Sequence, residues 1–221
     1  MTVPEAMQAR HSVRQYTDRP IGPDLVRALN EEITRCNTEG HLYIQLLTEA
    51  PEAFRGFLAT YGLLKGVRNY IAMAGPDGDD LDERVGWYGE RLVLLSQMLG
   101  LNTCWVGGTY SKKKIRAAVG EGEKLVCVIA LGYGANQGRP HRNKPMESLY
   151  QANGEIPDWF RRGMEAVMLA PTAVNQQKFL FSLNGSTVSA KATGGPYSKV
   201  DLGIVKYHFE AGAGKENFTW A

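Results

Sequence analysis

The sequence predicts an α+β protein built from two related units. Helical and extended patterns alternate along its 221 residues, and one long amphipathic helix and one strongly apolar strand stand out. The order of a helix, a strand and a long helix recurs near the end of the chain. We therefore expect one subdomain over residues 1–150 and a shorter second subdomain over residues 151–221.

The first helix is predicted over residues 3–10. Thr2 and Glu5 have the spacing of a capping box, and Pro4 suits a first helical turn. The elements expected next are a helix over 23–34, a strand over 42–47, a strand over 68–74 and a turn over 75–78.

The longest helix is predicted to end at Gly100, which stands where a C-terminal stop belongs. After it we expect a short basic helix over 112–119 and a strand over 124–132. The strand is apolar without alternation, which indicates burial on both faces. The apolar residues of the longest helix recur at helical spacing, typical of core packing: Val85, Tyr88, Leu92, Leu95, Met98 and Leu99.

The second unit echoes the first in outline. At a shift of 134 residues, the segments 21–27 and 43–47 fall on 155–161 and 177–181. The longest helix has its counterpart over 201–210. Because few residues are identical, either an internal duplication or a chance similarity of helix–strand patterns accounts for the echo.

Composition argues against several classes of protein. The net charge of +2 gives no reason to expect nucleic acid or a membrane as a partner. The three cysteines have no CxxC spacing, which indicates a reduced protein, and the four histidines are too dispersed to form a metal site. No secretory signal pattern and no apolar run of membrane-spanning length is present, so we expect a cytoplasmic protein.

A candidate anion site follows the first helix. Arg10, Ser12 and Arg14 place two guanidiniums and a hydroxyl within five residues, together with His11. Arg offers a planar fork of donors and Ser a short neutral one, so the cluster suits a phosphate monoester. The alternative is an ordinary solvated surface.

Three loops accompany this cluster. Gly107 and Gly108 let the backbone approach a flat ligand closely. Residues 138–145 form a basic loop that suits a phosphate, and residues 170–177 carry small and amide side chains that suit a polyol or heterocycle edge. Each loop has a simpler alternative as a turn, a solvated edge or a connection. No arrangement of a nucleophile with a base is legible.

The order of these motifs resembles the FMN-dependent nitroreductase family over residues 8–150. The matching segments are Arg-His-Ser-Val-Arg, Leu-Gly-Leu-Asn-Thr-Cys-Trp-Val-Gly-Gly and Leu-Gly-Tyr-Gly, followed by a basic loop that ends at Pro145. Ala-Pro-Thr-Ala-Val-Asn-Gln-Gln, at 170–177, is similar to the family's Ala-Pro-Ser-x-x-Asn-x-Gln loop. The resemblance implies a central, mainly antiparallel sheet flanked by helices.

One departure from the family concerns the position of that last loop. In typical members it lies between the Arg motif and the long helix, and in their homodimers it reaches the FMN of the partner subunit. Here it lies in the second unit. The chain therefore resembles a divergent branch in which the second unit completes the pocket, as a pseudo-dimer within one chain. A monomer with pseudo-dimeric halves and a homodimer both remain open.

The resemblance assigns FMN-binding roles by position. The Arg motif would hold the phosphate, ribityl chain and pyrimidine edge, and the basic loop would complete the phosphate clamp. The two glycines would face the flavin, with one N–H near N5, and the 170–177 loop would line the opposite side. The residues concerned are Arg10, His11, Ser12, Arg14, Gly107, Gly108, Arg142, Lys144, Pro171, Thr172, Ala173 and Asn175.

The implied activity is an FMN-dependent oxidoreductase. NADH or NADPH would drive the reduction of nitroaromatics, quinones or similar electron-poor small molecules by ping-pong hydride transfer. No catalytic side chain is expected, because the flavin carries the chemistry. Two alternatives stay open: a flavin-binding or regulatory module without turnover, and another flavin reaction such as reductive dehalogenation.

Overall fold

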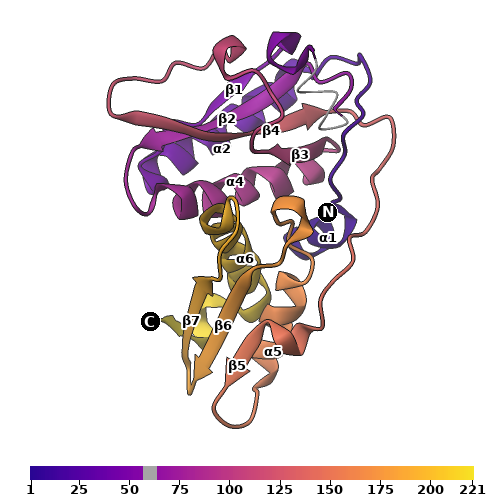
Figure 1. Cartoon of the computed structure of the whole chain (residues 1–221). Coiled ribbons are helices and arrows are strands. Elements are labelled where there is room, and N and C mark those ends of the chain that lie inside the picture. The colour runs from indigo at the N-terminus through magenta and orange to yellow at the C-terminus, as the bar shows by residue number, and fades with distance from the viewer. Residues whose placement is uncertain (57–63) are drawn as a thin grey trace.

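The computed structural model describes residues 1–56 and 64–221, and these form two four-stranded sheets with helices between them (Figure 1). The first sheet has the order β1 (Gln45–Leu47), β2 (Asn69–Pro76), β4 (Glu123–Gly132) and β3 (Asn102–Val106), and all its pairs are antiparallel. The second has the order β5 (Tyr150–Ala152), β6 (Phe179–Asn184), β7 (Thr187–Ala192) and β8 (Thr219–Trp220). Its central pair is antiparallel and its two outer pairs are parallel.

The helices lie between the sheets and beside them. The α-helices are α1 (Val3–Ala9), α2 (Pro23–Gly40), α4 (Leu81–Met98), α5 (Asp158–Val167) and α6 (Ser198–Ala213). Single 3₁₀ turns occur at Pro51–Phe54, Lys112–Lys114, Met146–Ser148, Ala173–Asn175 and Lys215–Asn217. In Figure 1, α4 separates the first sheet from α6, while α5 and α6 pack behind the second sheet. The antiparallel sheet flanked by helices confirms the predicted fold class.

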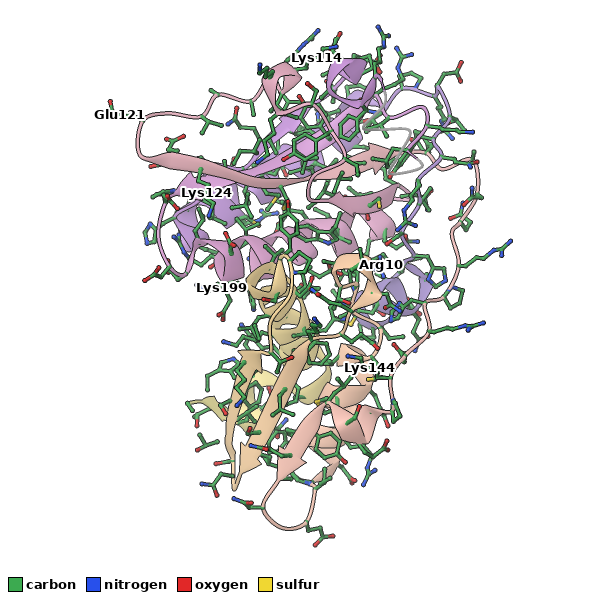
Figure 2. All side chains as sticks on the ribbon, in the orientation of Figure 1. Arg10, Lys114, Glu121, Lys124, Lys144 and Lys199 are labelled. Carbon is green, nitrogen blue, oxygen red and sulfur yellow. The ribbon has the colours of Figure 1, made fainter. Side chains whose placement is uncertain are left out.

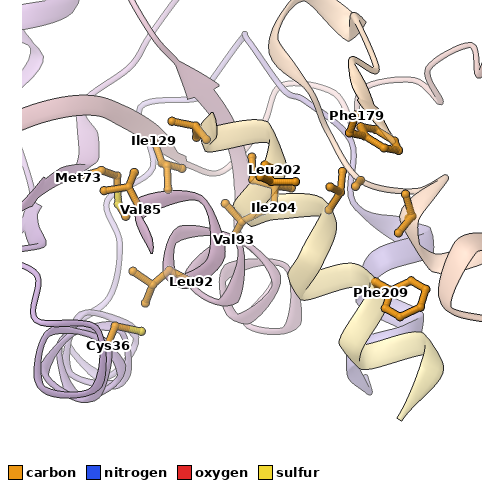
Figure 3. Close-up of a cluster of buried hydrophobic side chains, with 14 of the residues drawn as sticks. Cys36, Met73, Val85, Leu92, Val93, Ile129, Phe179, Leu202, Ile204 and Phe209 are labelled. Atoms are coloured by element: carbon orange, nitrogen blue, oxygen red, sulfur yellow. The ribbon is translucent and has the colours of Figure 1, made fainter. Parts of the chain in front are cut away.

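The central strands of the first sheet are buried on both faces. On β2, Ile71 and Met73 contact the core beneath α4, whereas Tyr70 and Ala72 face a second apolar cluster on the far side. The apolar run of β4 divides in the same way. The larger core continues from the first sheet through α4 and α6 to Phe179 on β6 (Figure 3). Both units therefore share one hydrophobic core.

Two helix signals in the sequence are confirmed. At α1, Thr2 Oγ1 accepts from the Glu5 amide and the Glu5 carboxylate accepts from the Thr2 amide at 2.7 Å, which completes the capping box. The long helix α4 is followed by Gly100 at φ 78°, a left-handed backbone that favours glycine.

Other boundaries differ from those predicted. Helix α2 continues to Gly40, because Cys36 extends its buried face beyond residue 34. The helix predicted over 112–119 is wrong, since only one 3₁₀ turn forms there. The amide of Arg116 donates to the Tyr70 hydroxyl and that of Ala118 to Gln45 Oε1, so these donors serve the sheet instead of a helix. Strands β3, β5, β7 and β8 were not predicted.

The order helix, strand, strand, long helix occurs in both units, as α2-β1-β2-α4 and as α5-β6-β7-α6. Strands β1 and β6 start at Gln45 and Phe179, a separation of 134 residues. The separation then shortens, because a long connection joins β1 to β2 whereas a tight turn at Gly185 joins β6 to β7. Across the described ranges, no helix is long and apolar enough to cross a bilayer.

Candidate functional site

A cleft lies between the two units and consists of two connected pockets. We call the first, of about 410 Å³, the apolar pocket. It lies between the end of β3 with residues 107–109 and the 171–174 segment with the start of α6. We call the second, of about 890 Å³, the basic pocket, and it is lined mainly by residues 10–15 and 136–141. The pockets share five lining residues, Ser12, Arg14, Pro171, Thr172 and Val174, and therefore form one cleft.

The apolar pocket presents backbone and apolar surface with few reactive groups. Gly107 and Gly108 expose their peptides on one side, and Val200 and Ile204 of α6 line the other. Cys104 also lines it, but burial raises the pKa of its thiol, so the sulfur stays protonated. The pocket therefore suits a flat apolar ligand and offers no thiolate nucleophile at Cys104.

The basic pocket is rich in cationic side chains. Arg10, Arg14 and Arg139 line it together with His11 and His141, and no carboxylate appears among the described residues that line it. Burial lowers the pKa of both histidines, and the charge of Arg10 lowers both further. Such a set of donors favours a compact anion, above all a phosphate.

Arg10 is held at the inner end of the basic pocket. Its side chain is only 3% exposed, and its Nε has no hydrogen-bond partner among the described residues. The nearest carboxylate oxygen is Glu90 Oε1, at 4.0 Å. Burial lowers the pKa of this guanidinium, and the charge of Glu90 opposes that shift. An anion bound in the adjoining pocket would stabilise the positive charge of this buried guanidinium.

Glu90 lies at the centre of a buried network between α4 and α6. Trp105 Nε1 donates to it at 3.0 Å, and His208 Nε2 lies 3.0 Å from its other oxygen. Burial alone raises the pKa of Glu90, but the bonds and charges of His208, Arg10 and Trp105 lower it below its ordinary value. His208 Nδ1 lies 2.9 Å from the Ala166 carbonyl, which can only accept, so this nitrogen donates there.

The loop opposite the glycines has an unusual backbone. Val174, Asn175 and Gln177 all have positive φ, between 44° and 54°. For a β-branched residue such as Val174 this is a strained conformation. Asp201 of α6 holds the loop, because its carboxylate accepts from the Ala173 amide at 2.8 Å and from Gln176 Nε2 at 2.7 Å.

The same loop is tied to the basic loop. The buried side chain of Gln177 accepts from the Lys144 amide and donates to Asn143 Oδ1, both at 2.7 Å. Asn175 Nδ2 donates to the Arg142 carbonyl at 2.7 Å. The two loops are therefore joined directly by hydrogen bonds.

The cleft brings together most of the residues that the sequence singled out. Arg142 and Lys144 do not line it, and Lys144 Nζ donates instead to the Gln177 carbonyl at 3.0 Å. Figure 2 shows Arg10 and Lys144 well apart. The predicted residues that do line it are Arg10, His11, Ser12, Arg14, Gly107, Gly108, Pro171, Thr172, Ala173 and Asn175.

Several residues that line the cleft were not predicted, among them Arg139, His141, Tyr197 and Asp201. Arg139 and His141 belong to the basic loop, whose charge was recognised although other members were chosen. Tyr197 and Asp201 lie at the start of α6. The turn Gly194-Gly195-Pro196 before that helix was the available signal, because it marks a sharp change of direction next to the cleft.

Comparison with protein-family models identifies the family of this chain. The model described as "Putative TM nitroreductase" matches residues 2–213, nearly the whole chain. The chain belongs to this nitroreductase family. The match covers both units, so the second unit is part of the family's own architecture. No curated protein matches the sequence.

Solved nitroreductase structures share the fold at low sequence identity. A putative nitroreductase from Thermotoga maritima MSB8 is 20% identical and has a TM-score of 0.71. The aligned region covers 98% of this chain and 85% of the Thermotoga chain. A putative nitroreductase in complex with FMN from Desulfovibrio desulfuricans is 19% identical, with a TM-score of 0.54 and coverages of 67% and 95%. A nitroreductase family protein from Streptococcus pneumoniae TIGR4 is 15% identical, with a TM-score of 0.53 and coverages of 66% and 98%.

Proposed function

We propose that this nitroreductase-family chain is an FMN-dependent oxidoreductase that uses NADH or NADPH to reduce nitroaromatics, quinones or similar electron-poor acceptors by a ping-pong mechanism. The observation that carries the proposal is the joining of the two pockets. One is apolar and faces two glycines, and the other holds three arginines, one of them buried with an unpartnered Nε. This pairing matches a ligand with a flat ring at one end and a phosphate at the other.

The residues of the cleft fit FMN. Arg10, Arg14 and Arg139 would hold the phosphate, with the Ser12 hydroxyl between the two pockets available to the ribityl chain. The ring would lie in the apolar pocket, between the Gly107–Gly108 peptides and the 171–174 segment. FMN, when bound, supplies the hydride-transfer chemistry that protein side chains lack.

The protein would contribute position and environment. The apolar wall of α6, including Val200 and Ile204, excludes water from one side of the pocket. Asp201 holds the strained loop against the same space. Arg14 lines both pockets, so its charge is placed to favour an anionic reduced ring. No protein side chain is needed to transfer the hydride itself.

A single chain would form the complete site. Its first unit provides the arginines and glycines, and its second unit provides the 171–175 loop and the start of α6. We therefore propose one FMN per chain and a working monomer with pseudo-dimeric halves. Sedimentation should show a monomer that retains bound FMN, whereas FMN bound only by dimers would contradict this arrangement.

The absorption spectrum of the purified protein tests the proposed function. After incubation with FMN and removal of the excess, the protein should keep the visible flavin bands. Anaerobic NADH or NADPH should bleach them, and a quinone should restore them. A chain that takes up no FMN would overturn the proposal. Stable FMN binding without bleaching by either nucleotide would favour the module without turnover.

A further inference from the structure

Tyr197 links the two units across the apolar pocket. It is the first residue before α6, and its ring packs against Gly107, where an added Cβ would collide with the aromatic carbons. Its hydroxyl donates to the Gly107 carbonyl at 2.5 Å. The side chain is still 37% exposed, so it forms part of the pocket wall.

The position of Tyr197 is enforced from the second unit. Its φ is 55°, a left-handed backbone that a bulky side chain rarely adopts. Gly195, two residues before Tyr197, has a φ of 96°. The carbonyl of Pro196, between them, accepts from Gln176 Nε2 at 2.8 Å. Since the same Gln176 amide donates to Asp201, the backbone before Tyr197 is tied to the 171–177 loop, which lies on the same side of the pocket. Strain kept by this many contacts is typical of a functional position.

The hydroxyl contact acts on a peptide with unusual freedom. Neither Gly107 nor Gly108 has a Cβ, so the backbone on both sides of their shared peptide bond is permissive. In a planar trans peptide the C=O and the following N–H point in opposite directions. A donor that fixes the Gly107 carbonyl therefore also fixes the direction of the Gly108 N–H.

We propose that Tyr197 is a positioning residue for the Gly107–Gly108 peptide, which it holds in the orientation that the ring of bound FMN requires. The FMN part of this inference rests on the proposed function. The consequence is that the second unit controls a backbone donor of the first unit. A hydrogen bond that served only to join the units would not need to end on a peptide carbonyl flanked by two glycines.

Tyr197→Phe removes the hydroxyl and keeps the ring, and Tyr43→Phe on the exposed edge of the first sheet serves as a matched control. In the free protein, the NMR order parameter of the Gly108 N–H should be lower in Tyr197→Phe than in the wild type, because the peptide loses the donor that fixes its carbonyl. Its FMN affinity, measured by fluorescence titration, should fall roughly two- to tenfold, the range expected for one net hydrogen bond. Tyr43→Phe should change neither quantity.

The outcomes separate the two proposals. If the wild type binds FMN and Tyr197→Phe matches it in both the Gly108 order parameter and the affinity, the positioning role is overturned while the proposed function stands. A lower order parameter with unchanged FMN affinity also overturns it, because the peptide orientation then does not serve the ligand. A wild type that binds no FMN overturns both. The ¹⁵N–¹H signal of Gly108 provides a third readout, since it should shift on FMN binding in the wild type.

Discussion

Gly86 on α4 and Gly203 on α6 each pack against the backbone of the other helix. Each glycine contacts the residue that lies three positions before the other glycine. A Cβ at Gly86 would collide with the carbonyl of Val200, and a Cβ at Gly203 would collide with the carbonyl of Glu83. Such reciprocity is what a two-fold axis produces at an interface between identical subunits. Here it occurs within one chain, which supports the proposed pseudo-dimeric arrangement.

The close contact of α4 with α6 at Gly86 and Gly203 predicts that alanine at either position destabilises the fold. Alanine is favoured over glycine within a helix by about 1 kcal/mol, but the collision here is with backbone, which cannot rotate away. Overpacking typically costs about 1–3 kcal/mol, so Gly86→Ala and Gly203→Ala should each lower the free energy of unfolding in urea. Gly78→Ala, whose Cβ meets only ordinary contacts, is the control. A gain in stability at both positions would show that the helices can separate freely.

The buried network predicts a large effect of Glu90→Gln. The change removes the carboxylate that lies beside Arg10 and His208, and it leaves the charge of Arg10 without this compensation in a buried place. Removing one partner of a buried ion pair costs about 3–5 kcal/mol. Urea unfolding measures this loss.

The exposed Glu31 offers a matched control for that experiment, since Glu31→Gln lies on the surface of α2. It should change the free energy of unfolding by less than about 0.5 kcal/mol. Comparable losses in the two variants would mean that the burial of Glu90 is not what makes it important.

The sequence predicted the elements whose signals are local. The capping box of Thr2 and Glu5 and the apolar run of β4 need no distant partner to be recognised, and both are present. Strand β3 was missed because Asn102 and Thr103 are polar. They are buried only through distant contacts, such as the bond from the Gly134 amide to Asn102 Oδ1.

The same distinction applies to the cleft. The Arg motif and the paired glycines are contiguous in sequence, so their type and order suffice to identify them. Tyr197 and Asp201 reach the cleft only because α6 packs along α4, which no local pattern reveals. Within the basic loop, charge alone could not distinguish Arg139, which lines the pocket, from Arg142, which does not.

Asp201 predicts a pH dependence of stability. Burial raises its pKa from 3.8 to about 6, although the bonds from Gln176 and Ala173 oppose the shift. The folded state therefore binds this proton more tightly than the unfolded state, so the contribution of Asp201 to stability is highest below the ordinary pKa and falls as pH rises towards 6. At about 1.4 kcal/mol per pKa unit, the fall is at most about 3 kcal/mol.

Asp201→Asn removes this titration and keeps an oxygen for the Ala173 amide. Urea unfolding of the wild type and the variant should be measured at several pH values across that range. The free energy of unfolding of the wild type minus that of the variant should fall as pH rises. Parallel pH profiles would contradict the role of Asp201 and assign the dependence to another group. Acid unfolding at lower pH should remain in both, because Glu90 has a lowered pKa and loses its stabilising charge there.

The composition of the phosphate clamp gives the last prediction. Arg139 lines the basic pocket, whereas Arg142 does not. The only bond from Arg142 to the cleft loops that the described residues show is at its backbone carbonyl, which accepts from Asn175 Nδ2. A hydrogen bond to a charged group contributes about 1.5–3 kcal/mol, so Arg139→Ala should weaken FMN binding roughly 10- to 100-fold. Arg142→Ala should leave the affinity within about twofold, since its side chain does not line the pocket and its charge acts only across screening solvent. Fluorescence titration of FMN against both variants measures the contrast. An equal loss in both would return Arg142 to the clamp, and no loss in either would leave the phosphate to Arg10 and Arg14.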